Sequence, residues 1–421
     1  MHEETAVADF GLDTTPRSLA DVARDAIARF RGGDLGPVPA LLAIVTLVAV
    51  FGLANPSTFL SVGNFANLLE QASAVIVIAM AVSFSLLLGE IDLAAGFTAG
   101  VAAAVMATRL QDGWDLPSAV LLSAVVAVAL GMFTGFMVAK VGIPSFVVTL
   151  ANFLIFQGIL LLLVKEGGTV GIDSELIRDM VGANLSPTQS WIFVVVALVL
   201  FAAFELRAQR ASHGAVPMSL VGMKVAGTTA VAVVATLLLN ENRALARANI
   251  EIKGMPVVVP LVLLLLVSIT FVLDNTRAGR HLYAVGGNAE AARRAGIRVD
   301  RIKLSAFTAC GLLAGVGGYF LASQINSVSA TTGANDTLLL AVGAAVIGGT
   351  SLFGGKGRMI NAALGGLVLA LIDNGLPLVG KRSVFWLVEV DFSSSGVKAI
   401  AAGLALLVAA SVDALSRKSA N

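Results

Sequence analysis

Charged residues are scarce in this chain: Asp, Glu, Lys and Arg make up 13% of its 421 residues, whereas a soluble domain has about 25%. The few charges cluster in short segments between long apolar runs. Hydrophobic residues account for 57% of the chain, and each run approaches or exceeds the ~20 residues that cross about 30 Å of hydrocarbon. The composition therefore excludes an ordinary soluble domain and predicts a membrane protein.

Cysteine and histidine are also rare. The single Cys310 excludes an intrachain disulfide, and the three histidines are far apart in the sequence. We see neither a nucleophile elbow nor a metal-binding spacing. The segment 349–357 approaches a P-loop, but its glycine spacing is off by one, and Gly357 stands where a Ser or Thr must ligate magnesium. We therefore expect no enzyme activity, metal site, bound cofactor or nucleic-acid partner for this chain.

The apolar runs predict an all-α transmembrane bundle of about 10–12 spans, some of them irregular or broken. Residues 1–37 form a polar N-terminal segment without the features of a cleavable signal peptide, and residues 38–416 form the transmembrane domain. The expected spans are 38–54, 66–88, 93–108, 118–139, 146–164, 191–205, 219–239, 256–273, 304–323, 338–352, 359–376 and 398–414.

The distribution of Lys and Arg predicts the orientation of the bundle. If the spans alternate and both termini are cytoplasmic, the inner segments carry 18 Lys and Arg and the outer segments carry 8. Such a bias is typical of cytoplasmic loops. Within the N-terminal segment, apolar residues from Leu19 to Phe30 recur at helical spacing among arginines, which predicts an amphipathic helix on the inner membrane surface. A disordered tail is the alternative.

Two predicted spans are interrupted. Glu90 and Asp92 lie with two glycines in the segment 86–96, and a second glycine-rich break covers 347–357. Broken segments in the two halves of a transporter often mark its pathway. The two carboxylates are therefore candidate pathway or gate residues. They could instead lie at the cytoplasmic interface and cap the next helix, where a carboxylate suits the positive helix N-terminus.

Further polar or aromatic residues lie inside predicted spans. Buried amides can hydrogen-bond to sugar hydroxyls, but they also join transmembrane helices to one another. The additional pathway or gate candidates are Phe146, Asn152, Gln157, Asp373 and Asn374.

The segment 274–303 is the most basic run of the chain and holds seven of its 28 Lys and Arg. Gly286, Gly287 and Asn288 should break the chain before a short helix over 289–295, which Gly296 ends. Ala291, Ala292 and Ala295 then make a small face suited to a shallow groove on a partner protein. A solvated basic loop is the alternative.

Four motifs in order resemble the permeases of ABC-type sugar importers of the ribose/xylose branch, and the chain looks closest to xylose-type members. The resemblance runs from about Phe65 to Ser411. Its motifs are 89–93, with Ala94 where Ser is typical, 144–150, 347–352 and the coupling loop, in which the matching residues are Gly279, Arg280, Gly286, Gly287, Asn288, Ala291, Ala292, Gly296 and Ile297.

This resemblance implies a permease homodimer in the inner membrane. It also implies a separate ATPase subunit, which holds ATP and magnesium and grips the coupling loop, and a sugar-binding protein on the outer face. The substrate would be a monosaccharide, and a pentose such as xylose is expected. The alternatives are an ABC permease for ribose or a branched-chain amino acid, and an ion-coupled secondary transporter that uses Glu90, Asp92 and Asp373 as proton carriers.

Overall fold

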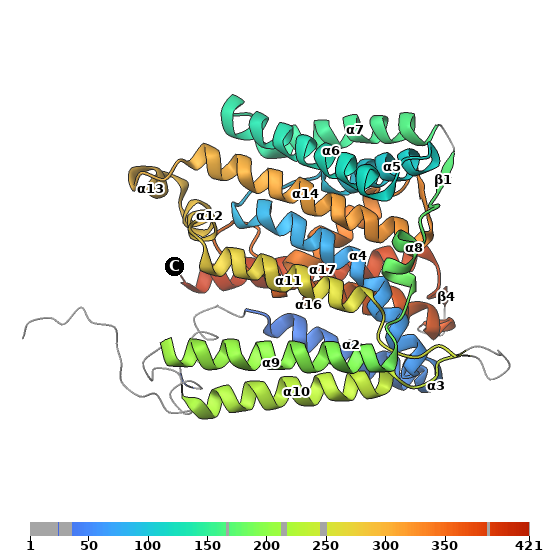
Figure 1. The fold of residues 1–421 in the computed structure, drawn as a ribbon. Helices are drawn as coiled ribbons and strands as arrows, with labels where there is room; N and C mark the ends of the chain where they lie inside the picture. The colour runs from blue at the N-terminus through green and yellow to red at the C-terminus, as the bar shows by residue number, and fades with distance from the viewer. Residues whose placement is uncertain are drawn as a thin grey trace, which may run out of the picture.

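The structure, a computed structural model, describes residues 24, 36–165, 168–211, 217–244, 251–384 and 388–420. Apart from Arg24, the predicted amphipathic helix lies outside these residues. The long helices run nearly side by side across the molecule (Figure 1). They are α2 (Val38–Ala54), α4 (Val62–Leu87), α5 (Ala95–Gln111), α6 (Leu116–Phe136), α7 (Ser145–Val164), α9 (Pro187–Ala211), α10 (Met218–Leu239), α11 (Val258–Asn275), α14 (Val299–Ile325), α15 (Asn335–Ile347), α16 (Met359–Val379) and α17 (Ser395–Ala420).

Each of the twelve predicted spans falls on one of these helices, so the all-helical transmembrane fold is confirmed. Among the described residues, eight helices are long and apolar enough to cross a membrane. The boundaries differ most where the sequence is polar or glycine-rich. Helix α14 begins five residues earlier than expected, which brings Lys303 into the helix, and α15 ends at Ile347, before the glycines that were included in the span 338–352.

Short elements occupy the two ends of the bundle. The π-helical turn η1 (Met137–Val141), α12 (Arg277–Gly287) and α13 (Ala289–Arg294) lie at one end, called here the α13 end. The opposite end holds α3 (Pro56–Phe59), α8 (Glu175–Gly182) and two antiparallel strand pairs, β1 (Thr169–Gly171) with β2 (Ser327–Ser329) and β3 (Lys381–Val384) with β4 (Val388–Asp391). The C-terminus lies at the α13 end (Figure 1).

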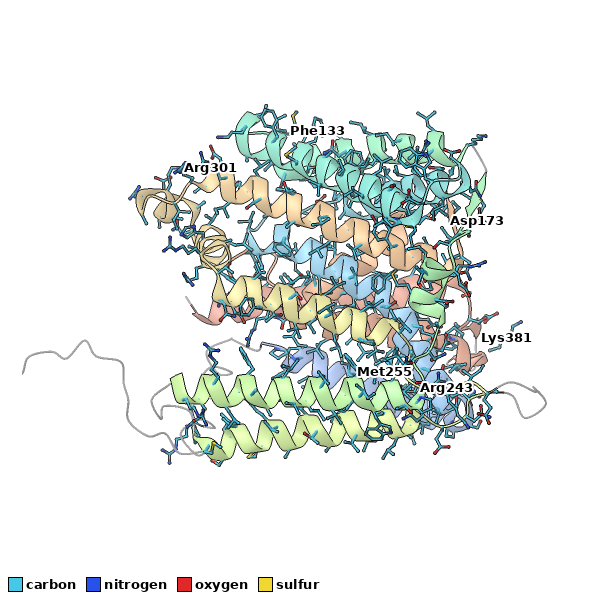
Figure 2. All side chains as sticks on the ribbon, viewed as in Figure 1. Phe133, Asp173, Arg243, Met255, Arg301 and Lys381 are labelled. Atoms are coloured by element: carbon cyan, nitrogen blue, oxygen red, sulfur yellow. The ribbon has the colours of Figure 1, made fainter. Side chains whose placement is uncertain are left out.

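Charged side chains mark the same two ends. Figure 2 places Arg301 at the α13 end and Asp173, Arg243 and Lys381 at the opposite end, with apolar side chains along the helices between them. Polar groups outside a hydrocarbon layer and apolar groups within it are the arrangement that a bilayer requires.

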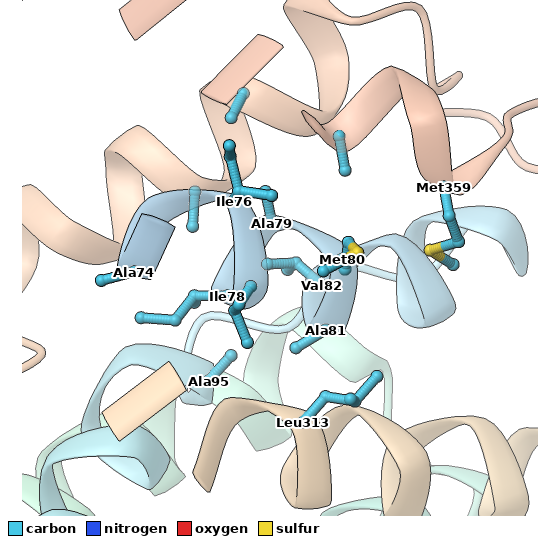
Figure 3. Close-up of a cluster of buried hydrophobic side chains, with 14 of the residues drawn as sticks. Ala74, Ile76, Ile78, Ala79, Met80, Ala81, Val82, Ala95, Leu313 and Met359 are labelled. Carbon is cyan, nitrogen blue, oxygen red and sulfur yellow. The ribbon is translucent and has the colours of Figure 1, made fainter. Parts of the chain in front are cut away.

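The core is centred on α4 and α14. Within its most apolar window, α4 is 72% buried, whereas the corresponding window of α9 is 6% buried. Small and branched side chains of α4 pack in this core against Ala95, Leu313 and Met359 (Figure 3). Close helix packing uses small residues, and Gly131 of α6 meets Gly311 of α14 backbone to backbone.

Helices α9 and α10 form a hairpin at one edge of the bundle (Figure 1). Glu205 and Lys224 join the two helices by an ion pair of 3.1 Å. Beyond α10, the guanidinium of Arg243 donates hydrogen bonds to the carbonyls of Leu239 and Gly254 and to Asn184 Oδ1, at 2.6–2.8 Å. This arginine therefore connects the end of α10 to the loops that contain Asn184 and Gly254.

Candidate functional site

The first broken segment, residues 88–94, connects α4 to α5. Gly89 has a φ of +75°, a backbone conformation that side chains disfavour. The carboxylate of Asp92, 5% exposed, accepts a hydrogen bond of 2.9 Å from the Ala94 N–H, and Cys310 Sγ lies 3.4 Å from its other oxygen. Asp92 thus holds the turn that leads into α5, next to the positive helix N-terminus, and its role as a gate or a cap remains a prediction.

Glu90 has a different partner. Its carboxylate forms an ion pair of 2.5 Å with Lys303, in the second turn of α14, and only 16% of the Glu90 side chain is exposed. In the first turn of α14, Asp300 forms an ion pair of 3.2 Å with Lys140 of η1. A cavity of about 310 Å³ lies beside both pairs, and its walls include Ser145, Ala289, Glu90 and Lys303.

The second broken segment, residues 348–358, packs against the first. The Gly355 N–H donates a hydrogen bond of 2.9 Å to the carbonyl of Leu87, the last residue of α4. A Cβ added at Gly354 would lie 2.7 Å from the amide nitrogen of Gly89. The two breaks, more than 250 residues apart in the sequence, are therefore in direct backbone contact.

Helix α12 contacts both breaks. A Cβ on Gly286 would come within 1.8 Å of the Leu87 carbonyl oxygen and 2.9 Å of the Gly355 nitrogen, so this position has room only for glycine. The hydroxyl of Tyr283 donates a hydrogen bond of 2.9 Å to the Gly357 carbonyl. Burial, and then the nearby Asp274 carboxylate, raises the pKa of Tyr283 above its ordinary value. We call this contact region of both breaks with α12 the junction.

The segment 274–303 differs from the prediction in its helices: Gly286 and Gly287, expected to break the chain, are the last two residues of α12. The segment holds two helices, because α12 precedes the expected short helix. Asn288 has extended backbone and caps α13 by accepting a hydrogen bond from the Ala291 N–H. Gly296, with a φ of +83°, follows the end of α13 as predicted.

The predicted small face of α13 needs correction. Ala292 is 5% exposed and packs into the core of its own chain, so it is not available to a partner in this structure. Ala291 and Ala295 remain exposed. Helical spacing places the three alanines near one another, but it does not say which of them faces the bundle.

The other residues of the loop are placed as follows. Arg280 and Gly287 are exposed, and nothing lies within 4 Å of a Cβ added at Gly287. Ile297 is half-buried against the core, and Gly279 lies so close to Leu273 that a side chain would collide with its backbone.

The motif 144–150 meets the first break at the start of α7. Thr149 Oγ1 donates a hydrogen bond of 3.1 Å to the Ile91 carbonyl. Phe146 is 54% exposed on the outside of the bundle. The Asn152 amide, 2% exposed, donates a hydrogen bond of 2.9 Å to Thr134 Oγ1, which joins α7 to α6. Of the two roles considered for buried amides, the contact of Asn152 is therefore the one that joins two helices.

The remaining candidates lie away from the junction. Gln157, twelve residues after Ser145, is half-buried in α7. Asp373 pairs with Lys398 of α17 at 2.9 Å, and the buried Asn374 donates a hydrogen bond of 3.3 Å to Gln71 of α4. At 1.5 Å per residue, Asn374 lies about 22 Å along α16 from its start at the junction. The predicted pathway residues therefore do not form one site, and their roles remain predictions.

Sequence analysis did not predict three contacts at or near the breaks, those made by Lys303, Tyr283 and Thr149. Lys303 and Tyr283 lie in the segment 274–303, and Thr149 lies in the motif 144–150, but no signal in the sequence pairs any of them with its partner. Within the described ranges, no group of three or more His, Cys, Asp and Glu is arranged to hold a metal ion.

Comparison with known proteins places the chain in a family. A family model described as the permease component of a branched-chain amino acid transport system matches residues 64–410. The xylose transport system permease protein XylH of Escherichia coli K12 is 33% identical over 351 residues, which cover 82% of this chain and 86% of that protein. XylH of Haemophilus influenzae is 32% identical over 356 residues, covering 82% and 90%.

The ribose import permease protein RbsC of Escherichia coli K12 is 28% identical over 374 residues, which cover 87% of this chain and 92% of that protein. No solved structure was found to match the chain. These matches confirm the resemblance inferred from the four motifs, because the family model covers nearly the same residues and the relatives include xylose and ribose permeases. The chain therefore belongs to this family of transport permeases and is a membrane transport component, not an enzyme.

Proposed function

We propose that the chain is the permease subunit of an ATP-driven importer that carries a monosaccharide, a pentose such as xylose, across the cytoplasmic membrane. The observation that carries this proposal is the junction, where α12 contacts the backbone of both broken helices at Leu87 and Gly355. The similarity to xylose and ribose permeases supports a sugar substrate.

The chain would be driven from outside itself. In this proposal a separate ATPase subunit grips α13 and its arginines on the cytoplasmic side, and both termini lie on that side. Closure of the ATPase on ATP shifts α12 and α13, and the junction passes the shift to the breaks. A second copy of the permease completes the pathway, and a sugar-binding protein delivers the substrate on the outer face.

A branched-chain amino acid is the second candidate substrate, favoured by the description of the matching family. Ion-coupled transport fits the geometry less well, because it needs carboxylates that are free to exchange protons. Glu90 and Asp373 are held by lysines, and Asp92 by a backbone N–H.

Uptake into proteoliposomes tests the proposal. The complex would be purified through a tag on the permease and supplied with ATP, its binding protein and radiolabelled xylose, ribose or leucine in separate assays. We expect sugar uptake that needs ATP and the binding protein, and no uptake by the permease alone. Preferential leucine uptake would favour the second candidate, and uptake by the permease alone on a proton or sodium gradient would contradict ATP-driven import.

A further inference from the structure

We propose that the Glu90–Lys303 ion pair positions the α5 side of the first break and transmits to it the movement of the coupling helix α13. The inference rests on the proposed function, since it assumes that a partner moves α13. It assigns to these two residues a role in coupling, in place of a role in contacting the sugar.

The first step is the attachment of α13 to α14. Only four residues separate the two helices. Ala292 and Val299 are both buried in the same core cluster, and the Ile297 N–H donates a hydrogen bond of 3.0 Å to the Ala292 carbonyl. A shift of α13 therefore moves the first turns of α14 with it.

The second step is the grip of α14 on the break. Lys303 is 25% and Glu90 16% exposed in their side chains, so the pair is largely shielded from water. A shielded pair is screened less by salt than a surface pair. The neighbouring pair of Asp300 with Lys140 is 46% and 50% exposed, and pairs this open contribute little. The Glu90–Lys303 pair is thus the stronger of the two ion pairs at the start of α14.

The third step is the position of this grip relative to Gly89. Helix α12 and Gly355 hold Leu87, on the α4 side of Gly89, whereas α14 holds Glu90, on the α5 side. The left-handed backbone of Gly89 lies between the two grips. The Glu90 N–H also donates a hydrogen bond of 3.0 Å to the Ser85 carbonyl of α4 across Gly89, so relative movement of α12 and α14 has to stretch or break this bond. The adjacent cavity of about 310 Å³ leaves room for such a movement.

Charge exchange in the full importer tests the inference. Glu90→Lys and Lys303→Glu each place like charges together, and the double variant restores an ion pair with its direction reversed. We expect each single variant to assemble and hydrolyse ATP but to lower sugar uptake per ATP about tenfold or more, and the double variant to recover most of the loss. A purely structural role would lower assembly and ATP hydrolysis together with uptake.

The matched control is the Glu205–Lys224 pair, which also joins two helices but lies in the peripheral α9–α10 hairpin. Its exchanges should leave uptake per ATP within about twofold of the unaltered complex. Single exchanges at Glu90 or Lys303 that transport normally, or a double variant that stays as uncoupled as the singles, would overturn the inference. Failure of the proposed function is a different result, in which the unaltered complex itself takes up no sugar.

Discussion

Replacing Gly286 by alanine should disrupt the junction, whereas the same change at the next residue should not. The added methyl of Gly286→Ala would lie 1.8 Å from the Leu87 carbonyl oxygen, about 1.6 Å short of the 3.4 Å at which ordinary contact begins. Both neighbours are backbone, so α12 must move away from the breaks. Overpacking of this kind costs about 1–3 kcal/mol of folding free energy.

Gly287 provides the matched control. It is exposed, and a Cβ there meets nothing within 4 Å. Gly287→Ala should therefore change the free energy of unfolding by less than about 0.5 kcal/mol. Thermal unfolding of the purified permease, followed by fluorescence-detected size exclusion, compares the two variants directly. Equal Tm values for Gly286→Ala, Gly287→Ala and the unaltered chain would refute the close packing of α12 on the breaks.

A bulky residue at each position separates packing from partner contact. Gly287→Leu should leave the Tm of the permease unchanged and abolish sugar uptake by the complex, because the new side chain lies on the exposed surface that a partner would cover. Ala292→Leu should instead lower the Tm, since Ala292 is buried in its own chain. Normal uptake with Gly287→Leu would contradict docking at this surface.

Three further outcomes follow from contacts elsewhere in the chain. Asp92→Ala leaves the buried Ala94 N–H without its acceptor and should destabilise the permease by about 1–3 kcal/mol, measured by thermal unfolding, with Asp92→Asn less affected. Arg243→Ala removes three hydrogen bonds and should make the loop after α10 more sensitive to protease in right-side-out vesicles. A cysteine at Arg294, whose side chain is 79% exposed, should react with a membrane-impermeant maleimide only in inside-out vesicles, and one at Asp173 only in right-side-out vesicles.

The spans and breaks could be predicted because their causes are local. Hydrocarbon thickness fixes the length of an apolar helix, and the glycines that interrupt the spans appear directly in the sequence. The contact of Asp92 with the turn before α5 was also within reach, since its hydrogen-bond partner lies two residues away. Local rules likewise placed Gly296 just after the end of α13.

The contacts of the junction could not be predicted in the same way. Glu90 and Lys303 are 213 residues apart, and no periodicity relates an acid in one segment to a base in another. From the sequence, Glu90 was either a pathway residue or a helix cap, and no partner for its charge could be named. The tertiary fold supplies Lys303, which offsets the free-energy cost of burying this carboxylate. The prediction that Ala292 faces a partner protein was wrong for a related reason. Only the packing of α13 against the bundle decides which side of this helix is buried.

The junction also brings together segments that lie at or beside the four motifs. A break in a membrane helix frees backbone carbonyls that need partners, since no water is available within the bilayer. Here three carbonyls at the breaks have partners from other segments: Gly355 donates to the Leu87 carbonyl, Thr149 to that of Ile91, and Tyr283 to that of Gly357. Each break also has hydrogen bonds within its own segment, such as Gly89 N–H to the Leu86 carbonyl and Thr350 N–H to the Ala345 carbonyl. A movement of α12 would nevertheless stretch or exchange the Tyr283 bond and disturb the contact between Leu87 and Gly355. Under the proposed function, in which a partner drives the permease through the segment 274–303, such contacts would let one movement reach both breaks.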